Sequence, residues 1–119
     1  MTEAGPRIRA ATPGEYVTVR SILEAALLEV DDGALARSSV LVAVDDDRIL
    51  GALVLRGVEI DAIAVRPGRR GQGIGRRLVE AAANRRPGLR VGFDPSVRPF
   101  YIKLGFDVRC SDERCRGSL

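Results

Sequence analysis

The chain contains no histidine and no tryptophan, and only one of its 19 basic residues is a lysine. Cysteine occurs twice, at Cys110 and Cys115. Two thiols without a histidine cannot complete the four-ligand shell of a structural zinc site, so we expect no metal cofactor. We expect both cysteines to be free thiols, although a hairpin around residues 111–114 would allow a disulfide between them.

Long apolar segments are also missing. No apolar run approaches the ~20 residues that span a bilayer, because Glu24 and Glu29 interrupt the most apolar stretch, residues 21–30. The N-terminus lacks the basic segment, apolar core and small-residue cleavage site of a secretion signal. We therefore expect a cytoplasmic protein without a membrane partner.

Aromatic residues make up only 4% of the chain, and they do not alternate with basic residues along any expected strand. Such alternation is typical of modules that stack nucleic-acid bases, so we expect no nucleic-acid partner despite the net charge of +3. Seven arginines nevertheless crowd residues 66–86. They are compatible with a solvated surface, or with affinity for phosphate groups.

The length predicts one domain over residues 1–119, with residues 1–5 as a loose end. Thr12, Pro13 and Glu15 form a capping-box helix start, and an apolar stripe carries that helix to about Val30. Strands are predicted at residues 7–10, 40–44, 49–55, 58–65, 89–93 and 106–109, and further helices at about 73–86 and 96–104.

The order of these elements predicts an α/β chain, with a mixed sheet of the α+β kind. Hairpins join the strands between residues 40 and 65, whereas a helix joins residue 65 to the strand at 89–93. A helical crossover implies a parallel pair. We therefore expect a mostly antiparallel central sheet that has one parallel pair and is flanked by helices.

The segment from Asp61 to Arg77 carries most of the functional information. A short apolar strand runs into a loop with three glycines, and that loop becomes the first turn of a helix flanked by arginines. Glycines let the backbone approach a ligand closely, and the N–H groups at a helix start favour anions. A phosphate-bearing cofactor is the expected ligand. A dinucleotide is the weaker alternative, because Arg76 stands where the third glycine of that fingerprint belongs.

Two motifs resemble those of the GNAT superfamily of N-acetyltransferases. The first is Arg70-x-x-Gly73-x-Gly75 after a central strand, and the second is an aromatic-Tyr pair before Gly-Phe, here residues 100–106. The resemblance covers residues 7–110 and implies a GNAT-like fold with the parallel pair at the cofactor site. It also implies that acetyl-CoA is the co-substrate. The implied cofactor-binding residues are Ile63, Ala64 and Val65 along the pantetheine arm, and Arg70, Gly71, Gln72, Gly73, Ile74, Gly75 and Arg76 around the pyrophosphate.

The resemblance further implies the catalytic groups. Tyr101 would protonate the departing thiolate, and Glu59 lies where several family members carry a general base. Asp61, two residues further along the same strand, and a water relay are the alternatives to Glu59. The strand amide of Val65 would hold the oxygen of the tetrahedral intermediate.

We therefore expect an enzyme that transfers an acetyl group from acetyl-CoA to an amine by direct attack, without a covalent enzyme intermediate. The acceptor could be a small molecule or a peptide, and a homodimer could complete its site. A protein that binds acyl-CoA as a sensor without catalysis is the alternative. It predicts CoA binding with transfer unaffected by Tyr101→Phe.

Overall fold

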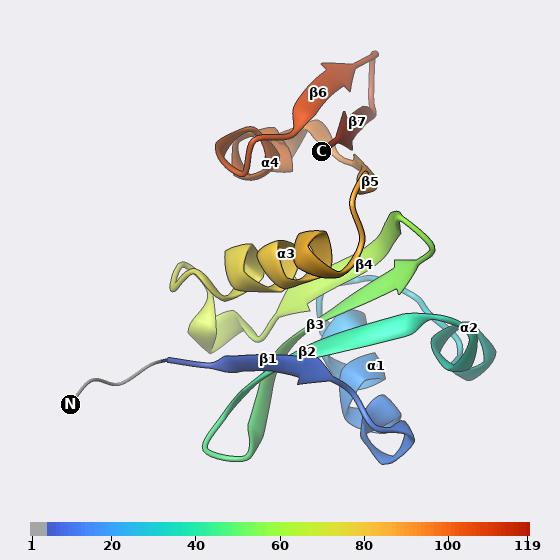
Figure 1. Cartoon of the computed structure of the whole chain (residues 1–119), viewed down its shortest axis with the longest axis vertical. Coiled ribbons are helices and arrows are strands. Elements are labelled where there is room, and N and C mark those ends of the chain that lie inside the picture. Colours follow the sequence, from blue (N-terminus) through green and yellow to red (C-terminus); the bar gives the residue numbers. More distant parts are fainter. Residues whose placement is uncertain (1–4) are drawn as a thin grey trace.

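The computed structural model describes residues 5–119, except for the side chain of Asp32, and forms one seven-stranded sheet with helices on both faces (Figure 1). Residues 1–4, most of the expected loose end, lie outside the described residues. The strands are β1 (Arg7–Ala10), β2 (Ser39–Asp45), β3 (Arg48–Arg56), β4 (Glu59–Val65), β5 (Arg90–Phe93), β6 (Asp107–Cys110) and β7 (Cys115–Ser118). The helices are α1 (Tyr16–Ala25), α2 (Asp32–Arg37), α3 (Ile74–Arg85) and α4 (Arg98–Lys103), with short 3-10 turns at Pro13–Glu15, Pro67–Arg69 and Pro95–Val97.

The strand order is β1-β2-β3-β4-β5-β7-β6, and every neighbouring pair is antiparallel except β4 and β5. The predicted fold class, a mixed sheet with one parallel pair flanked by helices, is confirmed. The parallel pair arises where expected, because α3 carries the chain from the end of β4 back to the start of β5.

Two apolar clusters hold the helices against the sheet. One face packs against α3 and α4 through residues such as Leu53, Leu78 and Phe106. The opposite face packs against α1 and α2 through residues such as Leu23 and Val42. The side chains of β2 and β3 are buried on both faces, so these two strands form the centre of the hydrophobic core.

The N-terminal helix begins as predicted and ends earlier. The Glu15 side chain accepts the Thr12 amide at 2.9 Å in the predicted capping box. The helix ends at Ala25 instead of Val30, because Leu27 adopts a left-handed conformation (φ 63°). The Leu28 amide then donates to the Leu23 carbonyl, which closes the helix end in a Schellman arrangement. The short helix α2 follows and was not predicted.

The C-terminal hairpin corrects the expectation of two free thiols. Strand β7, which was not predicted, inserts between β5 and β6 and places Cys115 directly opposite Cys110. Their Cα atoms lie 4.0 Å apart and the two sulfurs are bonded. Directly opposed residues of an antiparallel pair lie at about this separation, which a count of cysteines cannot foresee.

Candidate active site

The two parallel strands of the sheet, β4 and β5, pair over a short length and then separate. Only two residue pairs join β4 to β5, Glu59 with Arg90 and Ile60 with Val91. Beyond them β4 continues to Val65, whereas β5 pairs only with β7. The two strands therefore diverge, and most of β4 has a neighbour along one edge alone.

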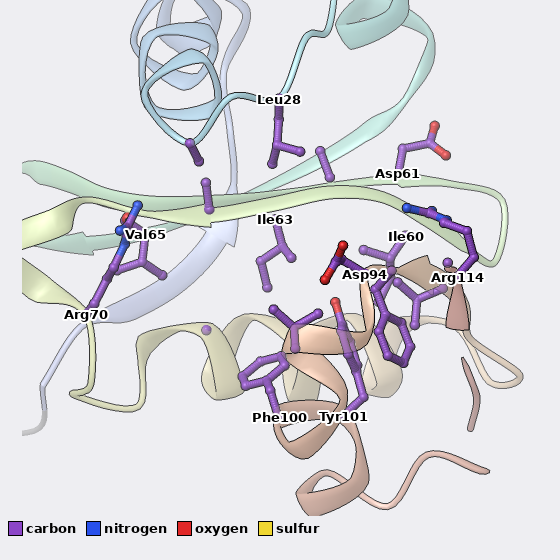
Figure 2. A pocket seen from close by; sticks show the side chains of 18 residues that line it. Leu28, Ile60, Asp61, Ile63, Val65, Arg70, Asp94, Phe100, Tyr101 and Arg114 are labelled. Carbon is purple, nitrogen blue, oxygen red and sulfur yellow. The ribbon is translucent and has the colours of Figure 1, made fainter. Parts of the chain in front are cut away.

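A cavity of about 640 Å³ lies where β4 and β5 separate, and it is lined by 18 residues from both faces of the sheet (Figure 2). Ala26 and Leu28 line it from the α1 side, whereas Phe100 and Tyr101 of α4 line it from the other. Arg70 and Val65 lie at one end, and Asp61 and Arg114 lie at the other. The volume is in the range of small-molecule sites.

The open edge of β4 offers backbone groups to this cavity. The Arg66 amide donates to the Leu50 carbonyl on β3 at 2.8 Å. Because amides alternate in direction along a strand, the amides and carbonyls of Ile63 and Val65 face the open edge, and those of Ala64 face β3. Ile63, Ala64 and Val65 all line the cavity. An extended ligand could pair here as an additional strand would.

The glycine loop adjoins one end of this edge. Gly71 and Gly73 have φ angles of 77° and 81°, which favour glycine, and a Cβ at either position would meet nothing within 4 Å. Gly73 precedes α3 directly, so the first amides of α3 have no acceptor within the helix. The loop thus presents backbone donors to open space.

Three side chains of this loop have charged or polar partners. Arg76 Nε lies 3.0 Å from Glu80, and Gln72 accepts a hydrogen bond from Arg69. Arg70 Nε instead donates to the Val65 carbonyl at 3.2 Å. Because a carbonyl is neutral, the Arg70 guanidinium keeps its full charge at the end of the cavity.

The α3 start is fixed by packing. Ile74 is 1% exposed within the core, so its backbone is the part that faces the loop. Gly75 lines the cavity, and a Cβ there would lie 3.4 Å from the Phe100 ring. Phe100 therefore packs closely against the start of α3 at Gly75.

Tyr101 lies in an aromatic cluster beneath the open edge. Its ring stacks on Phe93 at 4.5 Å between centroids, and it makes edge contacts with Phe100 and Phe106. Burial raises the pKa of Tyr101 to about 12, so the phenol stays protonated at neutral pH. Figure 2 shows its hydroxyl directed toward β4, and Tyr101 and Asp94 both line the cavity.

The predicted carboxylates lie apart from Tyr101. Glu59 does not line the cavity, and both of its oxygens lie 3.3 Å from Arg116 Nη2. Asp61 lines the cavity but accepts two hydrogen bonds from Arg56, at 2.9 and 3.1 Å. A register shift between β3 and β4 leaves Asp61 without a pairing partner, and Figure 2 shows it on the opposite side of β4 from Tyr101.

Two charged residues of the lining were not predicted as site residues. Asp94 follows β5 and accepts the Ser96 amide at 2.8 Å. That hydrogen bond chiefly, and the nearby charge of Arg114, lower the pKa of Asp94. The sequence Asp94-Pro95-Ser96 after a strand is a cap signal that could have drawn attention to Asp94, whereas nothing around Arg114 marks it.

Within the described residues there is no group of three or more histidine, cysteine, aspartate or glutamate side chains suited to a metal ion. None of the helices in that part of the chain has the length and apolar character that a bilayer crossing requires.

Comparison with known proteins agrees with this arrangement. The family described as acetyltransferase (GNAT) domain matches residues 36–108. A peptidyl-lysine N-acetyltransferase of Salmonella typhimurium, YjaB, is 39% identical over 88 residues, which make up 71% of this chain and 61% of that protein. The matched part thus spans less than two thirds of the relative.

Solved structures share the fold over nearly the whole chain. The solution structure of apo YjaB from Escherichia coli has a TM-score of 0.71 at 24% identity, covering 97% of this chain and 96% of that one. An acetyltransferase of Bacillus subtilis in complex with CoA has a TM-score of 0.75 at 21% identity, covering 96% of this chain and 97% of that one.

Proposed function

The chain belongs to the GNAT acetyltransferase domain family, and we propose that it transfers an acetyl group from acetyl-CoA to an amine. The observation that carries this proposal is a cavity lined by an unpaired strand edge, a buried tyrosine, and Arg70 and Gly75 on either side of the glycine turn before α3. The curated relative acts on peptidyl lysine by its name, which supports an amine as the acceptor class.

The donor would bind along the glycine loop and the open edge. Backbone donors at residues 70–76 and the charge of Arg70 would bind the pyrophosphate. The pantetheine arm of acetyl-CoA would pair with Ile63 and Val65, whose backbone amides and carbonyls face the cavity. To do so, it would displace Arg70 from the Val65 carbonyl, which would release the guanidinium for the phosphates. This pairing would place the thioester between β4 and Tyr101.

The thioester is already reactive, so the main task of the protein would be to align the amine with the thioester carbonyl. A neutral amine attacks the thioester carbonyl, the new C–N bond forms, and the C–S bond breaks as the thiolate leaves. The carbonyl oxygen would receive a hydrogen bond from an open-edge amide, that of Val65 as predicted. Tyr101 would donate a hydrogen bond to the leaving sulfur. With a pKa of about 12, it remains a donor at every physiological pH.

The base is a separate part of the proposal. Glu59 can take the amine proton only through water, because its side chain lies outside the cavity lining. Asp61 lines the cavity, and its ion pair with Arg56 would have to open before it could accept a proton. Glu59 is also paired, with Arg116, so pairing does not distinguish the two carboxylates. We propose a water relay that ends on Glu59, the predicted base.

Two measurements test this function. Saturating acetyl-CoA should raise the melting temperature, since a ligand that binds only the folded state stabilises it. Tyr101→Phe should then lower kcat about hundredfold, as loss of an acid catalyst does, with acetyl-CoA affinity and melting temperature retained. An unchanged melting temperature with acetyl-CoA would contradict the proposal.

The sensor alternative gives a different pattern. A non-catalytic protein would also be stabilised by acetyl-CoA, but the slow release of CoA in the presence of amines would be the same for Tyr101→Phe and the wild type. Phe100→Leu is a useful comparison, because it alters the same aromatic cluster without removing a hydroxyl. A rate that responds to Tyr101→Phe much more than to Phe100→Leu supports the enzyme.

A further inference from the structure

The end of the cavity opposite Arg70 contains an arginine that the donor does not need. Figure 2 shows the Arg114 side chain reaching from the start of β7 toward Asp61 and β4. Arg114 lines the cavity together with Gly92 and Asp94. Since the donor would occupy the Arg70 end and the open edge, this second end is where the acceptor would lie.

Two guanidinium groups converge at this end. A Cβ placed on Gly92 would lie 3.2 Å from Arg114 Nη2 and 3.2 Å from Arg116 Nη1. Both guanidinium groups therefore pack closely over Gly92, where a side chain would otherwise lie. Like charges repel, so an anion bound to Arg114 at this point would offset that repulsion.

Among the described residues, the neighbouring acids form ion pairs with other arginines and not with Arg114. Glu59 pairs with Arg116 through Nη2, which leaves Nη1 facing Gly92. Asp61 is held by Arg56. Within the described residues, no carboxylate lies within ion-pair distance of Arg114, although its charge acts on Asp94. Arg114 therefore keeps guanidinium donors for an anionic ligand.

We propose, building on the acetyltransferase function above, that the acceptor is an amine of amino-acid size that also carries a carboxylate. The carboxylate would bind to Arg114, which lines the cavity, with Arg116 beside it outside the lining. The ammonium group would lie beside Asp94, which lines the cavity together with Tyr101. Guanidinium groups suit carboxylates because they offer paired donors. The Arg114 end would then select zwitterionic amines over polycations.

A matched pair of acceptors tests this specificity. Each free amino acid is compared with its primary amide at saturating acetyl-CoA, with spermidine and a lysine peptide as cationic acceptors, and CoA release is followed. The amine of the amide loses its proton more easily, so chemical reactivity alone favours the amide. We expect at least one amino acid to have a kcat/KM about tenfold or more above that of its amide and of both cationic acceptors.

Arg114→Gln tests the role of Arg114 in acceptor binding, and Arg109→Gln is the matched control. Arg109 projects from β6 with 87% of its side chain exposed and does not line the cavity. Arg114→Gln should raise KM for the preferred amino acid about tenfold or more, abolish its advantage over the amide and leave acetyl-CoA affinity unchanged. Arg109→Gln should change none of these quantities.

Binding provides a second readout that does not require turnover. Calorimetric titration of the protein saturated with CoA should detect the preferred amino acid and lose that signal in Arg114→Gln. Preference for the amide or for the cationic acceptors, or equal behaviour of the two arginine variants, would overturn this inference and leave the acetyltransferase in place. Absence of acetyl-CoA binding would overturn the proposed function, and this inference with it.

Discussion

The two ends of the cavity are built in different ways. The donor end, where we propose that acetyl-CoA binds, consists mainly of backbone: the open edge of β4, a glycine loop with two left-handed residues and the start of α3. The acceptor end, where we propose that the amine binds, consists of side chains: Arg114 just before β7, with Arg116 of β7 beside it, and Asp94 after β5. Backbone geometry suits a ligand shared by a whole family. Side chains on a short hairpin can change without disturbing the fold, so they suit the substrate that varies.

The difference continues into the scaffold around each end. The donor end adjoins β3 and β4, which pair over six residue positions and have buried side chains. The acceptor end rests on four-residue strands, and only two residue pairs join them to β4. Local openings are easier where fewer contacts must break. We therefore expect changes to the hairpin to affect acceptor use before they affect acetyl-CoA.

The largest expected effect comes from a substitution at the donor end. Gly73→Val places a β-branched residue at a φ of 81°, where such residues are strongly disfavoured. The loop should rearrange and raise the Kd for acetyl-CoA about hundredfold, as measured by calorimetry. Gly68→Val is the control, because its Cβ also meets nothing within 4 Å and its φ lies outside the left-handed range. Equal loss in both variants would show that bulk, not backbone conformation, is responsible.

Tyr101 lies where the two ends meet, and its proton affinity can be measured directly. The chain has two tyrosines and no tryptophan, so Tyr16→Phe leaves Tyr101 as the only phenol. Its absorbance titration should have a midpoint of about 12, two pH units above the ordinary value of 10.0, which is a hundredfold in proton affinity. The stability that the protonated phenol provides is present below pH 10 and falls as the pH rises toward 12. A midpoint near 10 would show that the ring is not buried.

Breaking the disulfide should weaken acceptor binding without weakening acetyl-CoA binding. Cys110→Ala combined with Cys115→Ala, or reduction of the wild type, should lower the free energy of unfolding by about 2 kcal/mol. Because Arg114 directly precedes Cys115, KM for the acceptor should rise several-fold while acetyl-CoA affinity stays constant. A reducing agent should have no effect on the double variant. Weaker acetyl-CoA binding after reduction would contradict the independence of the two ends.

The smallest expected effect lies outside both ends. Arg9 and the Thr12 amide lower the pKa of Glu15 to about 2 from its ordinary value of 4.5. Glu15→Gln should cost about 1 kcal/mol at pH 7, which allows for partial exposure of the ion pair. The difference from the wild type should shrink as the pH falls from 4.5 toward 2, because protonation removes the same interaction. Glu24→Gln, on an exposed ion pair of 3.9 Å, should have little effect, and neither variant should alter the KM of either substrate.

The strand, loop and helix of the donor end could be predicted from sequence because their signals are local. The strand, the glycines at 71, 73 and 75 and the following helix are contiguous, and hydrophobic periodicity fixes the elements around them. The same holds for the capping box at Thr12 and Glu15, which the structure contains. The roles proposed for Tyr101 and Glu59 came from the family resemblance, and they stay predictions until the variants are measured.

The remaining features depend on contacts between distant segments. Leu27 ends α1 in a conformation that usually requires glycine, so the sequence gives no stop signal there. Strand β7 is short and contains a glycine and an arginine, and it becomes a strand only by pairing with β5 and β6 on either side. The convergence of Arg114 and Arg116 over Gly92 follows from that pairing and could not be foreseen without it.

The most direct test of the two-ended cavity is a calorimetric comparison of Gly73→Val and Arg114→Gln, each titrated with acetyl-CoA and, when saturated with CoA, with the preferred amino acid. We predict that Gly73→Val weakens acetyl-CoA binding about hundredfold, and that Arg114→Gln leaves it unchanged while losing the amino acid. Loss of acetyl-CoA binding in Arg114→Gln, or retention of the amino acid by that variant, would contradict the account.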